Sequence, residues 1–377
     1  MKKLIYIFSV FFFTFLSLSS IAQTGPGGVG SSTNLILWLN ADSITAPNNT
    51  PVSQWNDLSP QQNHASQSTS TNQPVLRVNS TNGHNVVEFD GVNDFLQLAN
   101  NITTTSAAIY LVLNNTATPT TSTYALSLQK HEFLSKIIGA SQNLRTGLKY
   151  GSSYYRVNDT IKTKLEMVSG QAKRVNGTIR TDRRGTGRIE SGAPPSFNNN
   201  SISVVGAYHN GTSASNFHYG NIAEVVVFND TLNAVQRRIL MNTLTAKYGS
   251  DMIDPAKDHY AYQATHSHDI IAVGRMQTFV QASARGHGVL EMSGPNDLQK
   301  GEFLFVGHDN GNLDTNGSDV PPTNESRLNR VWRADLTGTP GTVKLKFYVD
   351  ANSTSNLAMT QILIDDDGNF SNGGTDA

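Results

Sequence analysis

"GNIAEVVVFNDTLNAVQRRILMNTLTAKYG", residues 220–249, contains the two local patterns that decide the fold class. Residues 222–228 are a valine-rich apolar run, which predicts a strand. Residues 231–249 then change to apolar residues at helical spacing. Asn233 followed three residues later by Gln236 predicts a capping box, and the final glycine suits a helix end. We therefore expect a strand followed by a helix that closes a domain.

Upstream of this stretch, short apolar runs alternate with turn residues, and only a period of two fits them. An Asn-Gly pair at 176–177 predicts a hairpin over 173–180, because both residues accept the positive φ of a type I′ turn. Many strands without helices between them indicate an all-β antiparallel sandwich. The predicted strands are 35–40, 85–89, 95–98, 108–114, 124–129 and 201–208.

A second β-rich domain is expected after the helix. We predict a first domain at 33–249, a linker at 250–258 and a second domain at 259–377. The second domain has predicted strands at 269–275, 302–309, 330–336, 343–350 and 359–367. Its last strand runs into a glycine-rich end with no cap, anchor or sorting region, so we expect this domain to be incomplete.

The N-terminus predicts export. Lys2 and Lys3 precede an apolar run, and small residues around Ala22 suit a signal peptidase, so residues 1–22 read as a signal peptide. The run is short for a spanning helix, and no other segment is apolar enough to cross a bilayer. Residues 23–32 are expected to be a flexible lead-in. We predict a mature protein that is secreted or lies on the outer cell surface.

The composition further limits the class of protein to which the chain can belong. The formal net charge is −1, which argues against a nucleic-acid partner. There is no cysteine, which excludes disulfides and thiolate zinc sites. An exported chain of this kind must therefore be stabilised by its hydrophobic core, and calcium is the one candidate cofactor. Only 15% of residues are charged, which is typical of an all-β extracellular protein with many turns.

Several segments together resemble a known domain family. The segments 35–42, 52–59, 86–98 and 203–249 resemble a laminin-G-like, concanavalin-A-like jelly roll of secreted Bacteroidota proteins. The part from 258 onward looks like the domain of unknown function that often follows such jelly rolls. The resemblance implies a two-sheet sandwich, a surface or secreted location, and a glycan-binding, adhesive or spacer role.

Glu88 is the one candidate catalytic residue. The concanavalin-like fold also hosts retaining glycoside hydrolases whose strand carries Glu-x-Asp-x-(x)-Glu, with both glutamates facing one groove. Glu88 and Asp90 match the beginning of that motif, but Val92 and Asn93 occupy the two positions where the second glutamate belongs. Since hydrolysis with retention needs two carboxyl groups, we predict no intact catalytic pair.

Asp90, Asn93 and Asp94 are candidate calcium ligands, because they offer hard oxygen atoms in a short loop. The alternative is purely structural, since Asp-Gly and Asn-Asp pairs also build turns between strands. A second acidic stretch, Asp365 to Asn369, has the same two interpretations, and there the turn is favoured because the EF-hand glycine and glutamate positions do not match.

Ligand contacts can be proposed at three more residues. Tyr154 could stack on a sugar ring, while Arg174 and Arg183 belong to a basic region that could meet acidic glycans. The alternatives are a core tyrosine and a solvated hairpin end. His266, His268 and Asp269 are interpreted as part of a polar loop without a metal site.

Three functions follow as hypotheses. The leading one is a non-catalytic module that binds glycans or acts in adhesion. The second is a glycoside hydrolase that uses Glu88, and the third is a passive spacer within a longer surface protein.

Overall fold

The computed structural model describes residues 25–116, 122–129, 131–137, 144–150, 153–159, 164–173, 178–183, 186–191, 202–285, 289–321, 326–348, 362–365, 368–371 and 375–376. The predicted signal peptide lies outside these residues. The described residues form antiparallel sheets and one α-helix, which confirms the all-β sandwich expected from the sequence.

Two sheets form the sandwich. Sheet 1 has eight strands, and β1 and β5 share one side of β18 while β7 lies on the other. Its strands are β1 (Leu35–Asn40), β4 (Val75–Thr81), β5 (His84–Asp90), β7 (Ala107–Leu113), β12 (Glu166–Lys173), β13 (Thr178–Arg183), β14 (Thr186–Ser191) and β18 (Tyr219–Phe228).

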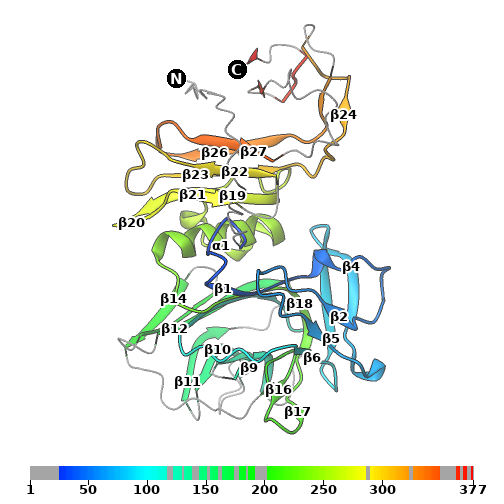
Figure 1. Ribbon diagram of the computed structural model, residues 1–377. Helices are drawn as coiled ribbons and strands as arrows, with labels where there is room; N and C mark the ends of the chain where they lie inside the picture. Colours follow the sequence, from blue (N-terminus) through cyan, green and yellow to red (C-terminus); the bar gives the residue numbers. More distant parts are fainter. Residues whose placement is uncertain are drawn as a thin grey trace.

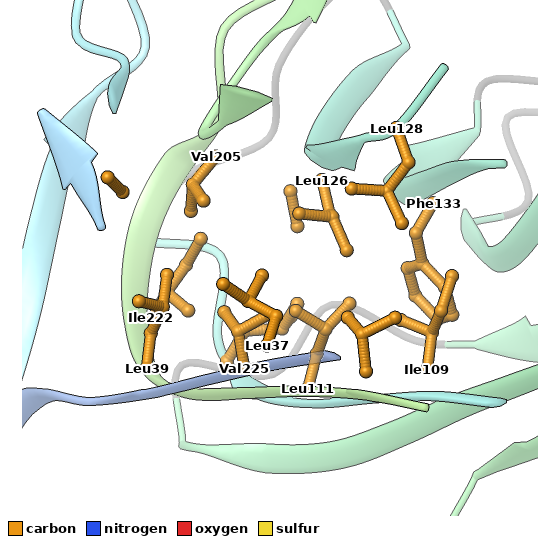
Figure 2. Packing of buried hydrophobic residues seen from close by; sticks show 14 of the residues in the cluster. Leu37, Leu39, Ile109, Leu111, Leu126, Leu128, Phe133, Val205, Ile222 and Val225 are labelled. Atoms are coloured by element: carbon orange, nitrogen blue, oxygen red, sulfur yellow. The ribbon is translucent and has the colours of Figure 1, made fainter. Parts of the chain in front are cut away.

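Sheet 2 also has eight strands. In spatial order they are β11 (Ser153–Asp159), β10 (Leu144–Tyr150), β9 (Glu132–Ile137), β8 (Thr123–Ser127), β15 (Val204–Val205), β6 (Leu96–Leu98), β3 (Ala65–Ser66) and β2 (Gln54–Trp55). Leu111 and Val225 from sheet 1 meet Leu126 and Phe133 from sheet 2 in a core of fully buried side chains (Figure 2).

The predicted strand at 201–208 is wrong as a continuous element. Residues 204–205 form β15, and Tyr208–His209 form β16, which pairs with β17 (Ala214–Ser215). Gly206 interrupts the strand with φ of +87°. A Cβ on Gly206 would lie 2.2 Å from the ring of Phe89, so glycine allows both the bend and the close approach.

The helix α1 (Ala234–Tyr248) covers the other face of sheet 1. The capping box is confirmed, because the Asn233 side chain accepts from the backbone of Gln236 and the Gln236 side chain accepts from Asn233 N. Strand β7 is buried along its whole length, with alternate residues in the sandwich core and in the layer under α1. Sheet 1 is therefore covered on both faces along β7.

A second pair of sheets lies on the far side of α1 (Figure 1). Sheet 3 contains β20 (Phe279–Gln281), β19 (His268–Met276), β23 (Phe303–His308) and β26 (Trp332–Thr337), and sheet 4 contains β21 (Ser283–Arg285), β22 (Leu290–Ser293) and β27 (Lys344–Phe347). Ile270 and Phe305 of sheet 3 pack toward α1, while Ile271 and Val306 pack toward sheet 4. The layers are thus stacked in the order sheet 2, sheet 1, α1, sheet 3 and sheet 4.

Short elements complete the chain. They are the 3₁₀ turns η1 (Ala41–Ser43), η2 (Ser70–Asn72), η3 (Ser250–Met252) and η4 (Pro255–Lys257), and the paired strands β24 (Thr315–Asn316) with β25 (Arg327–Leu328) and β28 (Leu363–Ile364) with β29 (Thr375–Asp376).

Residues 25–29 are buried, which the sequence did not indicate. The backbone N–H of Ala272 on β19 donates to Gly27 O at 3.2 Å. Gly27 has φ of +75°, and a Cβ there would lie 2.8 Å from the Ile239 side chain on α1. This segment therefore lies against both the helix and sheet 3.

Candidate functional site

The predicted residues Glu88 and Asp90 lie on the same face of β5, at the end of sheet 1. Their neighbours Val87 and Phe89 point into the sandwich core, so alternation places Glu88 and Asp90 on the opposite face. Across the strand pair, Glu88 faces Asn221 and Asp90 faces Tyr219. We call Arg77, Glu88, Asp90, Val92 and Tyr219 the rim patch.

Glu88 is held by an arginine. Arg77 Nε donates to Glu88 Oε2 at 2.8 Å, and Arg77 Nη2 donates to Glu88 Oε1 at 3.1 Å. Both carboxylate oxygens are therefore engaged in a fork-to-fork pair with the guanidinium. Their side chains are 36% and 38% exposed, so the pair can be reached from solvent.

The loop after β5 is built as a turn. Asp90 Oδ1 accepts from the backbone N–H groups of Val92 at 2.8 Å and Asn93 at 3.2 Å, and Asp94 Oδ2 accepts from Asp90 N at 3.0 Å. Gly91 has φ of +74°, and a Cβ there would lie 2.7 Å from Tyr219 Cβ. The turn therefore needs glycine, both for its backbone conformation and for the approach of Tyr219.

Asp94 is buried beneath this turn, with 5% of its surface exposed. Burial raises the pKa of Asp94 to about 6, and the nearby Asp90 carboxylate contributes in the same direction. The backbone N–H of Asp90 opposes the shift but does not cancel it. Asp94 is thus a carboxyl group that takes up a proton at mildly acidic pH.

The calcium ligands predicted at Asp90, Asn93 and Asp94 come together in this loop, where Asp90 Oδ1 and Asp94 Oδ2 accept from backbone N–H groups of the turn. Three backbone N–H groups donate to the two aspartates, and Asn93 Nδ2 donates to Asn72 Oδ1 at 3.2 Å. Among the described residues, no group of three His, Cys, Asp or Glu side chains could hold a metal ion. The chain's own hydrogen bonds account for the residue pattern, and calcium stays a prediction.

Two exposed apolar side chains flank the turn. Val92 at its tip is 69% exposed and Tyr219 is 40% exposed. Tyr219 was missed from the sequence because the predicted strand began at residue 222, whereas β18 begins three residues earlier. The sequence signal for the longer strand was Gly220, which lies between Tyr219 and the apolar run.

The predicted ligand-binding residues are not brought to the rim patch. Tyr154 lies on β11 opposite Lys149, at the edge of sheet 2, and Arg183 lies on β13 opposite Thr186. Arg174 lies outside the described residues. Their ligand contacts stay predictions.

Lys149 itself belongs to a polar cluster on the outer face of sheet 2. Its Nζ lies 2.7 Å from Glu132 Oε2, and 5.6 Å and 5.5 Å from the ring centres of Tyr124 and Tyr208. Desolvation opposes the charged form of Lys149, but the hydrogen bond and charge of Glu132 outweigh it and raise the Lys149 pKa above its usual range. Glu132 and Tyr124 are buried, so neither offers an exposed surface to a ligand.

The polar-loop interpretation of the histidine region is wrong for His268 and Asp269, which begin β19. The His268 ring lies 5.7 Å from the His84 ring on β5 and 5.8 Å from the His308 ring on β23. Farther along, Asp365 Oδ1 accepts from the backbone N–H groups of Gly368 and Asn369, as in a turn. Asp367 lies outside the described residues.

Comparisons with known proteins give a partial match. The profile of a domain of unknown function (DUF8202) matches residues 263–377. A search of curated proteins found no match.

Among solved structures, a heptameric SAP-like pentraxin from Limulus polyphemus is 12% identical, with TM-score 0.34, over 46% of this chain and 89% of that one. Domain 4 of AbnA, a GH43 extracellular arabinanase from Geobacillus stearothermophilus in complex with arabinotriose, is 12% identical, with TM-score 0.38, over 55% of this chain and 98% of that one. Trypanosoma rangeli sialidase in complex with sialic acid is 14% identical, with TM-score 0.38, over 59% of this chain and 35% of that one. All three TM-scores lie below 0.5, so these likenesses carry no argument about the site.

Proposed function

We propose that this chain is a secreted or cell-surface, non-catalytic module that contacts glycans through the rim patch. The observation that carries this proposal is Tyr219, an exposed aromatic ring directly opposite Asp90 on the neighbouring strand. An aromatic face packs against the apolar C–H face of a sugar ring, while carboxylates and amides bond its hydroxyl groups. The rim patch offers both kinds of contact in one row.

The rigidity of the patch supports binding. Asp90 is held by the turn, Glu88 by Arg77, and Tyr219 by β18 and the backbone of Gly91. Side chains that are already ordered lose less conformational entropy when a ligand binds. The export pattern at the N-terminus agrees with a role outside the cell, and no helix among the described residues is long and apolar enough to cross a membrane.

One observation favours the hydrolase as a second candidate. Burial raises the pKa of Asp94 to about 6, and the charge of Glu88 adds to this shift. Glycoside hydrolysis needs a proton-donating acid together with a second carboxyl group. Against it, Arg77 occupies both oxygens of Glu88, and Asp94 is buried. We therefore rank binding above catalysis.

The test compares two matched variants in a glycan-array and cell-binding assay on residues 23–377. Tyr219→Ala is expected to weaken glycan binding by about tenfold or more, as removal of a central aromatic contact does. Phe279→Ala removes a similarly exposed ring (43%) on β20 and should leave binding unchanged. Equal loss in both variants would disprove the rim patch, and no binding by the unmodified chain would favour the spacer.

The same samples separate the remaining alternatives. Binding that is lost with a chelator and restored by calcium would support a metal at Asp90, Asn93 and Asp94. Polysaccharide turnover that disappears in Glu88→Gln would replace the binding proposal by the hydrolase, whereas turnover that survives this change would exclude Glu88 as the nucleophile.

A further inference from the structure

The outer face of sheet 4 is the far end of the layer stack, and its side chains are polar. Along β22, Leu290 and Met292 are buried against sheet 3, so Glu291 and Ser293 lie on the other face. Along β27, Leu345 packs inward, and the lysines on either side of it are exposed. The apolar core beneath therefore fixes this face, and Lys344 and Lys346 on it are exposed.

Three cations share this face. Arg285 on β21 faces Glu291 on β22, and Glu291 faces Lys346 on β27. In the next rung Ser293 faces Lys344. The two lysines are about 7 Å apart along their strand, and Arg285 lies about 10 Å across the sheet from Lys346. With one carboxylate among them, the face has a formal charge of +2 on a chain whose net charge is −1.

Tyr348 holds part of this arrangement in place. Its hydroxyl donates to Glu291 Oε2 at 2.5 Å. The Arg285 guanidinium lies 3.8 Å from the ring centre, and Lys346 Nζ lies 4.4 Å from it. Cation–π contacts of this kind position both cationic groups. The Glu291 carboxylate thereby accepts from the Tyr348 hydroxyl and lies between Arg285 and Lys346 in the strand register.

We propose that the outer face of sheet 4 binds an acidic polysaccharide, with Lys344, Lys346 and Arg285 contacting its carboxylate or sulfate groups. In the neighbouring rung Ser283 faces Ser293 and Ser293 faces Lys344, so two hydroxyl groups beside these cations can bond the sugar hydroxyls. Nucleic acid fits less well, because the Tyr348 ring already has two cationic partners and offers no platform for a base. This site is separate from the rim patch and assigns a binding role to the second β-rich region.

The experiment uses the double variant Lys344→Glu/Lys346→Glu in the full chain. Heparin and polygalacturonate serve as sulfated and carboxylated probes, and dextran serves as the neutral probe. The double variant should bind both acidic probes about tenfold more weakly or worse, and binding by the unmodified chain should weaken as salt is added. Lys300→Glu, an exposed lysine outside this face, is the matched control and should bind nearly as the unmodified chain does.

Distinct outcomes separate this proposal from the rim patch. Tyr219→Ala should leave binding of the acidic probes unchanged, and the double variant should leave array glycans bound at the rim unchanged. The proposal is overturned if the two lysine changes have no more effect than Lys300→Glu. It is also overturned if dextran binds equally well, or if a single-stranded oligonucleotide binds more tightly than either acidic polysaccharide.

Discussion

The two layers on either side of sheet 1 differ in their chemistry. The sandwich layer between sheets 1 and 2 is packed from apolar side chains (Figure 2). The helix layer, between sheet 1 and sheet 3, also contains an ionic network. In it, Lys247 Nζ lies 3.0 Å from Glu224 Oε2 and 3.0 Å from Asp42 Oδ2. Glu224 is only 2% exposed at its side chain, so this network lies within the apolar layer.

The network is fully bonded around Glu224. Trp38 Nε1 donates to its Oε1 at 2.8 Å, and Tyr248 Oη donates to its Oε2 at 2.7 Å. Burial would raise the pKa of Asp42, but the His84 hydrogen bond and the Lys247 charge outweigh it and hold that pKa well below its usual range. The difference between the layers teaches that the sandwich relies mainly on non-directional burial, whereas in the helix layer directional bonds also orient the helix against the sheet.

The largest effect is expected from Lys247→Met, which keeps the volume of the side chain but removes its charge. Glu224 then remains buried without its cation, while Asp42, which is 29% exposed, keeps its contact with His84; the loss of the buried pair costs about 3–5 kcal/mol of unfolding free energy. Denaturant titration at pH 7 measures this loss. Lys173→Met, which breaks an exposed pair with Asp230, is the matched control and should cost at most about 1 kcal/mol. Equal costs would show that the network contributes nothing beyond a surface pair.

In the sandwich layer, Leu111→Ala should cost about 2–5 kcal/mol, because a fully buried side chain leaves a cavity that its neighbours fill only partly. The control is Gln97→Ala on β6, an exposed position in the same sandwich, which should change the free energy by about 0.5 kcal/mol or less. Denaturant titration of both variants measures the difference. A cost for Leu111→Ala as small as that of the control would mean that this layer is loosely packed.

Much of the fold could be predicted because its causes are local. Alternation and β-branched residues locate β1, β5, β7 and β18, and the Asn233–Gln236 spacing locates the start of α1. The predicted strands at 269–275, 302–309, 330–336 and 343–350 correspond to β19, β23, β26 and β27. In each case the pattern lies within about ten residues, so no knowledge of distant partners was needed.

The candidate site was harder to predict from the sequence, because its contacts join residues that are distant along the chain. The Asp90 turn is a local motif, and its Asp-Gly and Asn-Asp pairs predict it from the sequence. The Arg77 partner of Glu88 and the exposed ring of Tyr219 depend on which strands are neighbours in the sheet. The helix layer is an extreme case, since the Trp38–Glu224 hydrogen bond joins residues 186 positions apart. A single sequence contains no direct record of such pairs.

The smallest of these effects is the change in unfolding free energy when acid protonates the histidines of the two layers. Desolvation, together with the charges of His308 and His84, lowers the pKa of His268 to about 4, from the ordinary value of 6.5. Asp269 opposes this shift, and Lys247 adds to it. At pH above 6.5 the ring is neutral in the folded and the unfolded chain. Between pH 6.5 and 4 only the unfolded chain takes up the proton, so stability falls as the pH falls.

The unfolding free energy lost between pH 7 and 4.5 should be about 1–2 kcal/mol smaller in His268→Phe than in the unmodified chain. The effect is limited to this size because the His268 ring is only partly buried. Chemical unfolding at pH 7, 5.5 and 4.5 measures it. His218 in the sandwich layer, whose pKa burial also lowers to about 4, supplies a comparison through His218→Phe. Asp94 acts in the opposite direction, because its raised pKa makes the folded chain take up a proton first and adds stability as the pH falls from 6 toward 3.8. If the unfolding free energy of His268→Phe falls with pH as steeply as that of the unmodified chain, the helix layer already accommodates the charged ring. If the free energy falls less steeply in both variants, acid sensitivity is common to the two layers.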